Sequence, residues 1–282
     1  MPCPGSRTDC RAAQPSRRNA VRYPEKPGRG AGWSSIRPMI ASLAPCFAGN
    51  LHWYKETLAL PGVHERAIAG RGLLEKGVAE DLMSRFADTY PGADRHALVS
   101  MWTQWHFGML VIPATAAALL LDRELPVDLD TIAIVAHESG RTAALVIQDE
   151  GRSHPGDATE RFSRLFEGHV EPLIHNFAGR FGVSRRLLWT NAAAIFEWTL
   201  QQVLAIGAPC PAALEEGRAL LQRRSGNDGR PNPICGAVLY PLEQGQPVRR
   251  RKVCCLRYLL PGVEDCGSLC PLPHIRGQQA PA

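Results

Sequence analysis

Apolar residues recur every three or four positions along most of the chain, the spacing that gathers them on one face of an α-helix. The pattern predicts helices within residues 40–90, 97–121, 159–181, 185–206 and 214–224. Pro61-Gly62 breaks the first region, an interruption near Pro113 leaves one or two helices in the second, and Pro172 kinks the third. Asp94 precedes the second region and can cap its first turn. These apolar faces predict a predominantly helical body.

Two stretches have the pattern of β-strands instead. In residues 131–149, β-branched and apolar residues lie on both sides of the sequence from His137 to Arg141 (HESGR), which predicts a hairpin with positive φ at Gly140. Residues 235–255 are also extended, with 243–247 as the turn of a second hairpin. The predicted fold class is therefore α+β: a helical body with one or two short β-hairpins and a cysteine-rich C-terminal segment.

The composition divides the chain into three parts. Residues 1–38 are rich in Pro, Gly, Ser and Arg without hydrophobic periodicity, so they are predicted to be a disordered basic tail. Residues 39–230 form the helical body, and residues 231–282 form the C-terminal segment. An alternative for the tail is translation from Met39, which intact mass of the native protein would test.

The charge and hydropathy restrict the partners and the compartment. The formal net charge is +5, but residues 1–38 carry eight basic and two acidic side chains, so the rest of the chain is close to neutral. We therefore expect no nucleic-acid surface. The N-terminus lacks the apolar core of a secretory signal, and the longest apolar run, residues 107–121, is shorter than a membrane-spanning helix. We expect no transmembrane segment and a cytoplasmic protein with reduced thiols.

Four of the nine cysteines fall within seventeen residues: Cys254, Cys255, Cys266 and Cys270. Four thiolates are what a structural zinc ion or an iron-sulfur cluster requires. Successive strand side chains point to opposite faces, so Cys254 and Cys255 could share one zinc ion only if the backbone turned sharply. In a binuclear cluster they could bind different metal atoms. We therefore assign all four as metal ligands.

Several motifs in chain order carry a family likeness. The cysteine segment VRRRKVCCLRYLLP with its following cysteine pair resembles the C-terminal hallmark of the FhuF-like siderophore-iron reductases. Residues 100–120 resemble that family's S-x-W-x-Q-W-x-x-G region, HESGR resembles its short turn, and residues 187–198 resemble its L-x-W-x-N segment. One departure is the three-residue spacer between Cys266 and Cys270, where the family pattern has two residues.

The resemblance implies a cofactor, a reaction and partners. It implies that Cys254, Cys255, Cys266 and Cys270 hold a [2Fe-2S] cluster. It further implies a cytoplasmic ferric-siderophore reductase that passes one electron to siderophore-bound Fe(III) and releases Fe(II). The substrate would be a ferric siderophore, with hydroxamate chelators favoured, and an unidentified protein or cofactor would donate the electron. Weak peripheral association with the inner membrane is left open.

Basic residues near the motifs are candidates for substrate binding. Arg250, Arg251 and Arg257 surround the first two cysteines, and they could attract an anionic chelate, attract an acidic donor or raise the cluster potential. His137 and Arg141 in the predicted turn could contact the same ligand. The alternatives are a solvated strand face and solvated turn residues. For the tryptophans of the two helical motifs, core packing is favoured over a cavity wall, and the remaining cysteines have no assigned role.

Two other functions compete with the reductase. A zinc-binding structural or interaction module would be colourless, and the adjacent cysteines without two C-x-x-C knuckles argue against it. An iron-sulfur electron carrier without a siderophore site would hold a cluster but reduce no ferric chelate. The size of the helical body argues against such a carrier.

Overall fold

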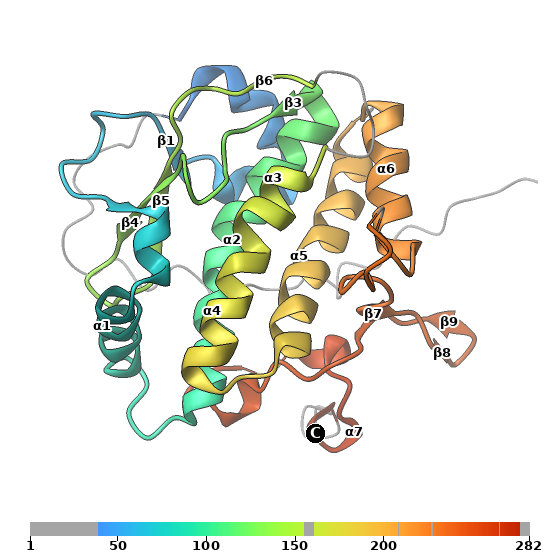
Figure 1. Ribbon diagram of the computed structural model, residues 1–282. Helices are drawn as coiled ribbons and strands as arrows, with labels where there is room; N and C mark the ends of the chain where they lie inside the picture. The colour runs from blue at the N-terminus through green and yellow to red at the C-terminus, as the bar shows by residue number, and fades with distance from the viewer. Residues whose placement is uncertain (1–38, 155–160, 208, 227, 265, 277–282) are drawn as a thin grey trace, which may run out of the picture. The chain divides into compact units, whose positions relative to one another are not determined.

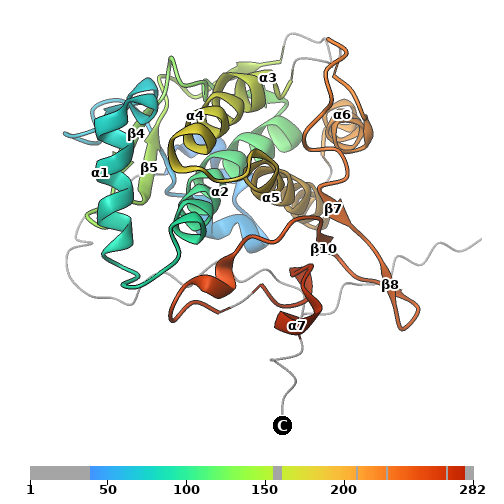
Figure 2. The same cartoon turned by 60° about the horizontal axis from the view of Figure 1, so that its bottom comes forward.

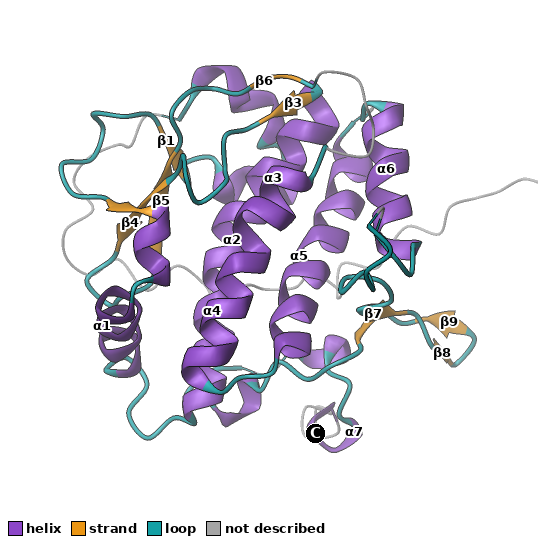
Figure 3. Cartoon of the chain, viewed as in Figure 1, coloured by secondary structure: helices purple, strands orange, loops and turns teal. Residues whose placement is uncertain are grey.

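The computed structural model describes residues 39–154, 161–207, 209–226, 228–264 and 266–276. The predicted tail, residues 1–38, lies outside them. The α-helices are α1 (Lys76–Ala87), α2 (Arg95–Leu121), α3 (Ser163–Leu165), α4 (Glu171–Phe181), α5 (Arg185–Ile206), α6 (Pro211–Gln222) and α7 (Pro273–Arg276). Short strands and 3₁₀ turns connect them (Figures 1 and 3). The predicted class is confirmed: a mostly helical fold with small sheets and a cysteine-rich C-terminal segment.

Helix α2 is the centre of the helical body and packs along α5 (Figure 1). Asp94 caps it as expected, accepting a hydrogen bond of 2.9 Å from the backbone N–H of Ala97. The predicted interruption at Pro113 is wrong, because the helix continues through the proline to Leu121. Pro113 lies in a fully packed part of the helix, where contacts on both sides offset the lost backbone hydrogen bond.

Length and composition alone would allow α2 to cross a membrane. However, 78% of its most apolar 18-residue window is buried inside the fold, as in the core helix of a folded domain. This agrees with the expectation of a buried core helix. No other helix in the described part of the chain is long and apolar enough to span a bilayer.

The region predicted as one helix over residues 159–181 is continuously helical from Ser163 to Phe181 among the described residues, with a π-helical turn, Phe166–Val170, between α3 and α4. Pro172 lies in the first turn of α4 and has no N–H to donate to the carbonyl of Gly168. That carbonyl instead accepts a hydrogen bond of 3.0 Å from the N–H of Leu129. The π-helical turn therefore interrupts the regular helix next to Pro172, the residue predicted to kink it.

The hairpin predicted within residues 131–149 is present as β4 (Ala133–Ala136) and β5 (Thr142–Val146), with Gly140 at φ +76°. Two further strands, β1 (Leu58–Ala59) and β2 (Ile68–Ala69), complete a four-stranded sheet in the order β1-β5-β4-β2. The prediction of helix over most of residues 40–90 is therefore only partly right. The two missed strands have two residues each, too few to show a periodic pattern.

The C-terminal part contains the second hairpin. Strands β8 (Leu242–Glu243) and β9 (Gln246–Pro247) pair around a tight turn. Outside them, β7 (Val238–Leu239) pairs antiparallel with β10 (Arg250–Arg251). A short β3 (Arg123–Glu124) pairs with β6 (Arg152–Ser153) at the opposite end of α2. Strand β10 leads directly into the cysteine segment.

Two fully buried histidines connect the π-helical turn to α2. The Nε2 atoms of His106 and His169 are 2.9 Å apart. His169 Nδ1 lies 2.7 Å from the carbonyl oxygen of Val127, which only accepts, so Nδ1 carries the proton. His169 Nε2 then accepts from His106, and His106 Nδ1 accepts from the Thr142 hydroxyl at 2.8 Å. Both imidazoles are neutral in this arrangement.

Acid is expected to destabilise the protein through this pair. Burial lowers the pKa of His169 to about 4 and holds the pKa of His106 well below its ordinary value. Both are close to 6.5 in the unfolded chain, which therefore binds more protons below that pH. The contribution of the two neutral histidines to the free energy of unfolding is fully present above pH 6.5 and is lost as the pH falls towards 4.

We expect the free energy of unfolding to fall by about 3 kcal/mol between pH 7.5 and 5.5 for the two histidines together. Urea titrations at these two pH values measure it. The control is H175Q, because the His175 side chain on α4 is 49% exposed, and this variant should keep the same pH dependence. Equal stability at both pH values would contradict the prediction.

Candidate metal centre

The four clustered cysteines lie in the segment that follows β10, near the ends of α2 and α5 (Figure 2). Cys254 and Cys255 come three and four residues after β10, and Cys266 and Cys270 flank a 3₁₀ turn, Gly267–Leu269. That turn accommodates the three-residue spacer. The segment is held to α2 by a hydrogen bond of 2.7 Å from the Ser100 hydroxyl to the carbonyl of Cys255.

The sulfur atoms of Cys255 and Cys266 are 3.6 Å apart. Two thiolates on one tetrahedral metal with bonds of about 2.3 Å are separated by about 3.8 Å, so this pair already has the spacing of ligands on one metal atom. Cys270 lies close enough for its charge to act on both Cys254 and Cys266. The four cysteines therefore lie near one another.

Among the described residues, no three side chains of His, Cys, Asp or Glu converge on one position where a single metal ion would fit. A mononuclear zinc site needs four donors around one ion, whereas a binuclear cluster held by four cysteines needs two on each iron. A close sulfur pair with two further cysteines beside it is compatible with the second donor set, in which no position needs more than two thiolates.

Backbone amides point at the first two sulfurs. Leu256 has φ +61°, a left-handed conformation that is rare for leucine and often marks functional sites. This turn places the N–H of Leu256 3.3 Å from the Cys254 sulfur, and the N–H of Arg257 donates to the Cys255 sulfur. Such hydrogen bonds stabilise thiolates and help to set cluster potentials. The backbone therefore turns sharply directly after the adjacent cysteines.

Ionisation of the thiols is governed by their pairing. A hydrogen bond from Cys266 holds the pKa of Cys255 well below its ordinary value, assisted by the charges of Arg251 and Arg257. The same bond, together with burial, raises the pKa of Cys266. Burial raises the pKa of Cys254 to about 11. Metal binding requires all these protons to leave, so the nearby arginines favour the ligating form.

Two of these arginines are almost completely buried: Arg251 is 4% exposed and Arg257 is 5% exposed. The Nε atom of each is buried without a hydrogen-bond partner within the described residues. Arg251 also forms no ion pair with Asp or Glu there, and its charge acts on Cys254, Cys255 and Cys266. Unpaired donors and buried positive charge beside four thiols are what an anionic cluster would satisfy.

The other basic residues of the segment 249–252 have different environments. Arg250 is buried, pairs with Glu243 and donates to the carbonyl of Ser268 at 3.3 Å. Arg249 pairs with Glu197 on α5. Lys252 is exposed. The alternative of a solvated charged face therefore does not describe Arg250, Arg251 or Arg257, because all three side chains are inside the fold.

The helical motifs meet the cysteine segment through a buried polar network. Asn191 on α5 accepts a hydrogen bond from Arg251 and donates to the Ser100 carbonyl at 3.1 Å. Gln104 also donates to that carbonyl, at 3.2 Å. In the sequence, Ser100, Gln104 and Asn191 are recognisable only as members of the family motifs, without a role in a site. Their polarity inside strongly apolar helices was the available signal for a site.

The HESGR turn is packed against both α1 and α2. The carbonyl of Gly140 accepts a hydrogen bond of 2.9 Å from the indole N–H of Trp102. His137 is engaged within the turn, since its Nδ1 accepts from the N–H of Ser139 at 3.1 Å. The guanidinium of Arg141 lies over the Trp105 ring, 5.1 Å from its centroid. Trp102 is fully buried and stacked on His106, as expected for packing.

Cysteines outside the cluster segment stay apart from it. The Cys235 thiol donates to the carbonyl of Gln222 at 3.3 Å, and the Cys210 thiol faces Asp122 at 3.8 Å. Cys46 is fully buried. None of these three joins the site. Cys3 and Cys10 lie outside the described residues.

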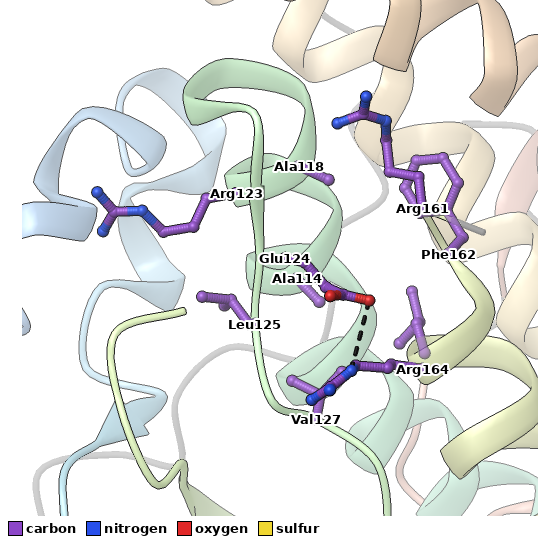
Figure 4. Close-up of a pocket in the computed structure, with 10 residues that line it drawn as sticks. Ala114, Ala118, Arg123, Glu124, Leu125, Val127, Arg161, Phe162 and Arg164 are labelled. Carbon is purple, nitrogen blue, oxygen red and sulfur yellow. Dashed lines mark ion pairs between the residues drawn. The ribbon is translucent and has the colours of Figure 1, made fainter. Parts of the chain in front are cut away.

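Two cavities lie away from the cysteines. One, between the end of α2 and the start of α3, has a volume of about 10 Å³, room for about one water molecule, and contains the Glu124–Arg164 ion pair of 3.4 Å (Figure 4). The other, of about 290 Å³, is lined by α1, α2 and Phe181. Neither contains a residue of the candidate metal centre.

Comparison with known proteins gives two family matches in chain order. The sequence model of a family described as ferric iron reductase FhuF-like transporter matches residues 100–235. The model of the FhuF 2Fe-2S C-terminal domain matches residues 251–272, which include the four clustered cysteines. Together the two matches cover more than half of the chain.

A curated relative is the ferric siderophore reductase of Escherichia coli (strain K12), 28% identical over 173 residues. The match covers 60% of this chain and 64% of the relative, less than two thirds of that protein's length. Among solved structures, ATP-bound aerobactin synthetase IucA from a hypervirulent pathotype of Klebsiella pneumoniae aligns with a TM-score of 0.45 and 14% identity, over 58% of this chain and 34% of that chain.

The motif order, the cysteine site and both family matches agree, and the chain belongs to the FhuF-like ferric iron reductase family, with its C-terminal 2Fe-2S domain.

Proposed function

We propose that this protein is a cytoplasmic ferric-siderophore reductase. The observation that supports it most directly is the gathering of four cysteines, two buried arginines and inward-facing amides in the segment that matches the 2Fe-2S domain. The E. coli relative bears the name ferric siderophore reductase. An unidentified donor would supply the electron, and hydroxamate chelates are the favoured substrates.

Cys254, Cys255, Cys266 and Cys270 are the proposed ligands. When bound, the [2Fe-2S] cluster supplies one electron, which converts siderophore-bound Fe(III) to Fe(II). Siderophore oxygens are hard ligands that hold Fe(III) tightly, so reduction to the softer Fe(II) releases the metal. The chain's own residues exclude water from Cys255 and Cys270, each 1% exposed, and hold positive charge beside the thiolates.

Arg141 is the best placed of the proposed substrate contacts, because its side chain is half-buried, whereas Arg257 is only 5% exposed and would act on a chelate through its charge. Burial raises the pKa of Tyr90, and the charges of both arginines oppose this, so both side chains lie near the same tyrosine. Trp105, under Arg141, has a buried indole N–H without a hydrogen-bond partner in the described structure. The charge of Arg257 also lowers the pKa of Cys255, so the group formed by Tyr90, Arg141 and Arg257 lies next to the proposed cluster ligands. The positive charges of Arg141 and Arg257 would attract an anionic chelate to this part of the surface.

The remaining predicted contacts have other proposed roles. Arg250 and Arg251 are buried, so they would influence an anionic chelate through their charge rather than by touching it. His137 would act through the turn, by holding the backbone that positions Arg141.

The proposal is tested by spectroscopy on anaerobically purified protein. We expect a visible chromophore and, after reduction by dithionite and removal of the excess, the electron paramagnetic resonance signal of a reduced [2Fe-2S] cluster. Adding one equivalent of ferrioxamine should remove that signal within the mixing time of the experiment. A ferrous chelator should then trap the Fe(II) that is released. Gallium desferrioxamine is the control, because Ga(III) matches Fe(III) in charge and size but accepts no electron.

The competing functions give different results in the same experiment. A zinc module would be colourless and hold one zinc ion per chain. An electron carrier without a siderophore site would show the reduced signal but keep it after ferrioxamine is added. Either result would contradict the proposed function.

A further inference from the structure

Asn191 is the centre of a fully buried polar network between α2, α5 and β10. Its Nδ2 lies 3.1 Å from the carbonyl of Ser100, 3.2 Å from the Ser100 hydroxyl and 3.2 Å from the Thr103 hydroxyl. Its Oδ1 accepts a hydrogen bond from Arg251. Asn191, Ser100 and Thr103 are all 0% exposed.

The directions of these hydrogen bonds are fixed by chemistry. The Ser100 carbonyl only accepts, so the amide nitrogen of Asn191 must face α2 and its oxygen must face Arg251. The Thr103 hydroxyl donates to the same carbonyl at 2.9 Å, and the Ser100 hydroxyl donates to the Cys255 carbonyl at 2.7 Å. Both hydroxyl oxygens are thus able to accept from Asn191, whose two amide hydrogens are shared among these three acceptors.

Two connections run from this network to the cysteines. Through Ser100, it holds the backbone at Cys255. Through Arg251, it holds a guanidinium whose charge acts on three of the four thiols. The two preceding residues, Arg249 and Arg250, pair with Glu197 and Glu243. In contrast, the neutral Asn191 is the side-chain partner found for Arg251 among the described residues.

A neutral partner preserves the positive charge of Arg251. A carboxylate at position 191 would neutralise it and would also face the Ser100 carbonyl without a donor. An apolar side chain would leave the guanidinium unoriented in a low-dielectric interior, where orientation strongly affects its interaction with a nearby charge. Asparagine thus fits both requirements: it orients the cation and leaves its charge intact.

We propose that Asn191 and Ser100 are positioning residues that set the reduction potential of the cluster, by fixing Arg251 and the Cys255 backbone against it. This rests on the proposed function only in taking the four cysteines as cluster ligands. The reduced cluster carries one more negative charge than the oxidised form, so a fixed positive charge beside it favours reduction. Loss of the network lowers the potential.

The test is a redox titration of the purified, cluster-containing protein, followed by electron paramagnetic resonance. We expect N191D, N191L and R251M to have more negative midpoint potentials than the unmodified protein, and R251K to fall between R251M and the unmodified protein. The matched control is R249M. This variant removes the arginine that directly precedes β10. Arg249 is paired with Glu197 and has no described contact with the cysteines, so the potential should be unchanged.

Circular dichroism and cluster content establish that each variant is folded and loaded. If N191L fails to fold, S100A gives the same readout, because it deletes only the hydroxyl that holds Cys255. Unchanged potentials in folded, loaded N191D and R251M would overturn the inference while leaving the reductase intact. Absence of a cluster from the unmodified protein would instead overturn the proposed function.

Discussion

Replacing Cys255 by serine is expected to abolish the chromophore and all reduction of ferric siderophores. Cys255 is 1% exposed, and its sulfur lies 3.6 Å from that of Cys266. The same sulfur accepts a hydrogen bond from the backbone N–H of Arg257. A serine hydroxyl is a harder and much less acidic donor than a thiol, so the cluster would lose one of its four anchors. Iron and sulfide analysis, the visible spectrum and the reduction rate measure the loss.

The matched control is C235S. Cys235 is a free thiol in the same C-terminal part of the chain, but its sulfur donates to the carbonyl of Gln222 and lies outside the site. This variant should keep the full spectrum and activity. A C255S protein with a complete, stable cluster would remove Cys255 from the ligand set, and loss of the cluster in C235S would add an unexpected ligand.

Replacing Gly140 by alanine is expected to destabilise the protein by more than about 3 kcal/mol. A methyl group there would lie 2.1 Å from the carbonyl oxygen of Leu82 on α1, and the φ of +76° is unfavourable for any residue with a Cβ. The turn would have to move, which would break the bond from Trp102 and displace Arg141 from Trp105. Thermal and urea unfolding measure the change.

Gly92 provides the control for this variant. Its φ is +78°, nearly the same, but a Cβ there would meet no atom within 4 Å. G92A should therefore cost only the strain of the left-handed conformation, about 1 kcal/mol. If G140A and G92A are destabilised equally, the close approach to α1 is unimportant and the prediction fails.

The sequence was most informative where a pattern is long. Helix α5 begins and ends where the apolar periodicity and the preceding Ser184 placed it, and Gly140 has the positive φ that the hairpin predicted. The two-residue strands β1 and β2 could not be predicted, because their pairing depends on β4 and β5, whose residues are distant in sequence. The local sequence predicts that Pro113 interrupts the helix, because helix propensity takes no account of the packing around α2.

For the site, the cysteine spacing was sufficient to indicate a metal centre and the resemblance indicated its kind. What could not be read was the environment of the arginines. In the sequence, Arg251 belongs to a run of basic residues typical of an exposed surface, yet its side chain is buried. Its partner Asn191 is 60 residues away along the chain, so the contact cannot be seen in the local sequence. Hydrogen bonds of such long range follow from tertiary packing and leave no local pattern.

The turn between Cys266 and Cys270 also bears on how this ligand pair can vary in evolution. Gly267, at φ +53°, begins a single 3₁₀ turn, in which the N–H groups of Leu269 and Cys270 donate hydrogen bonds to the carbonyls of Cys266 and Gly267. One turn of backbone accommodates all three residues of the spacer, so this fold is compatible with more than one residue count between the two cysteines. A search pattern that demands two residues between these cysteines would pass over this chain, whereas one that allows two or three would retrieve it.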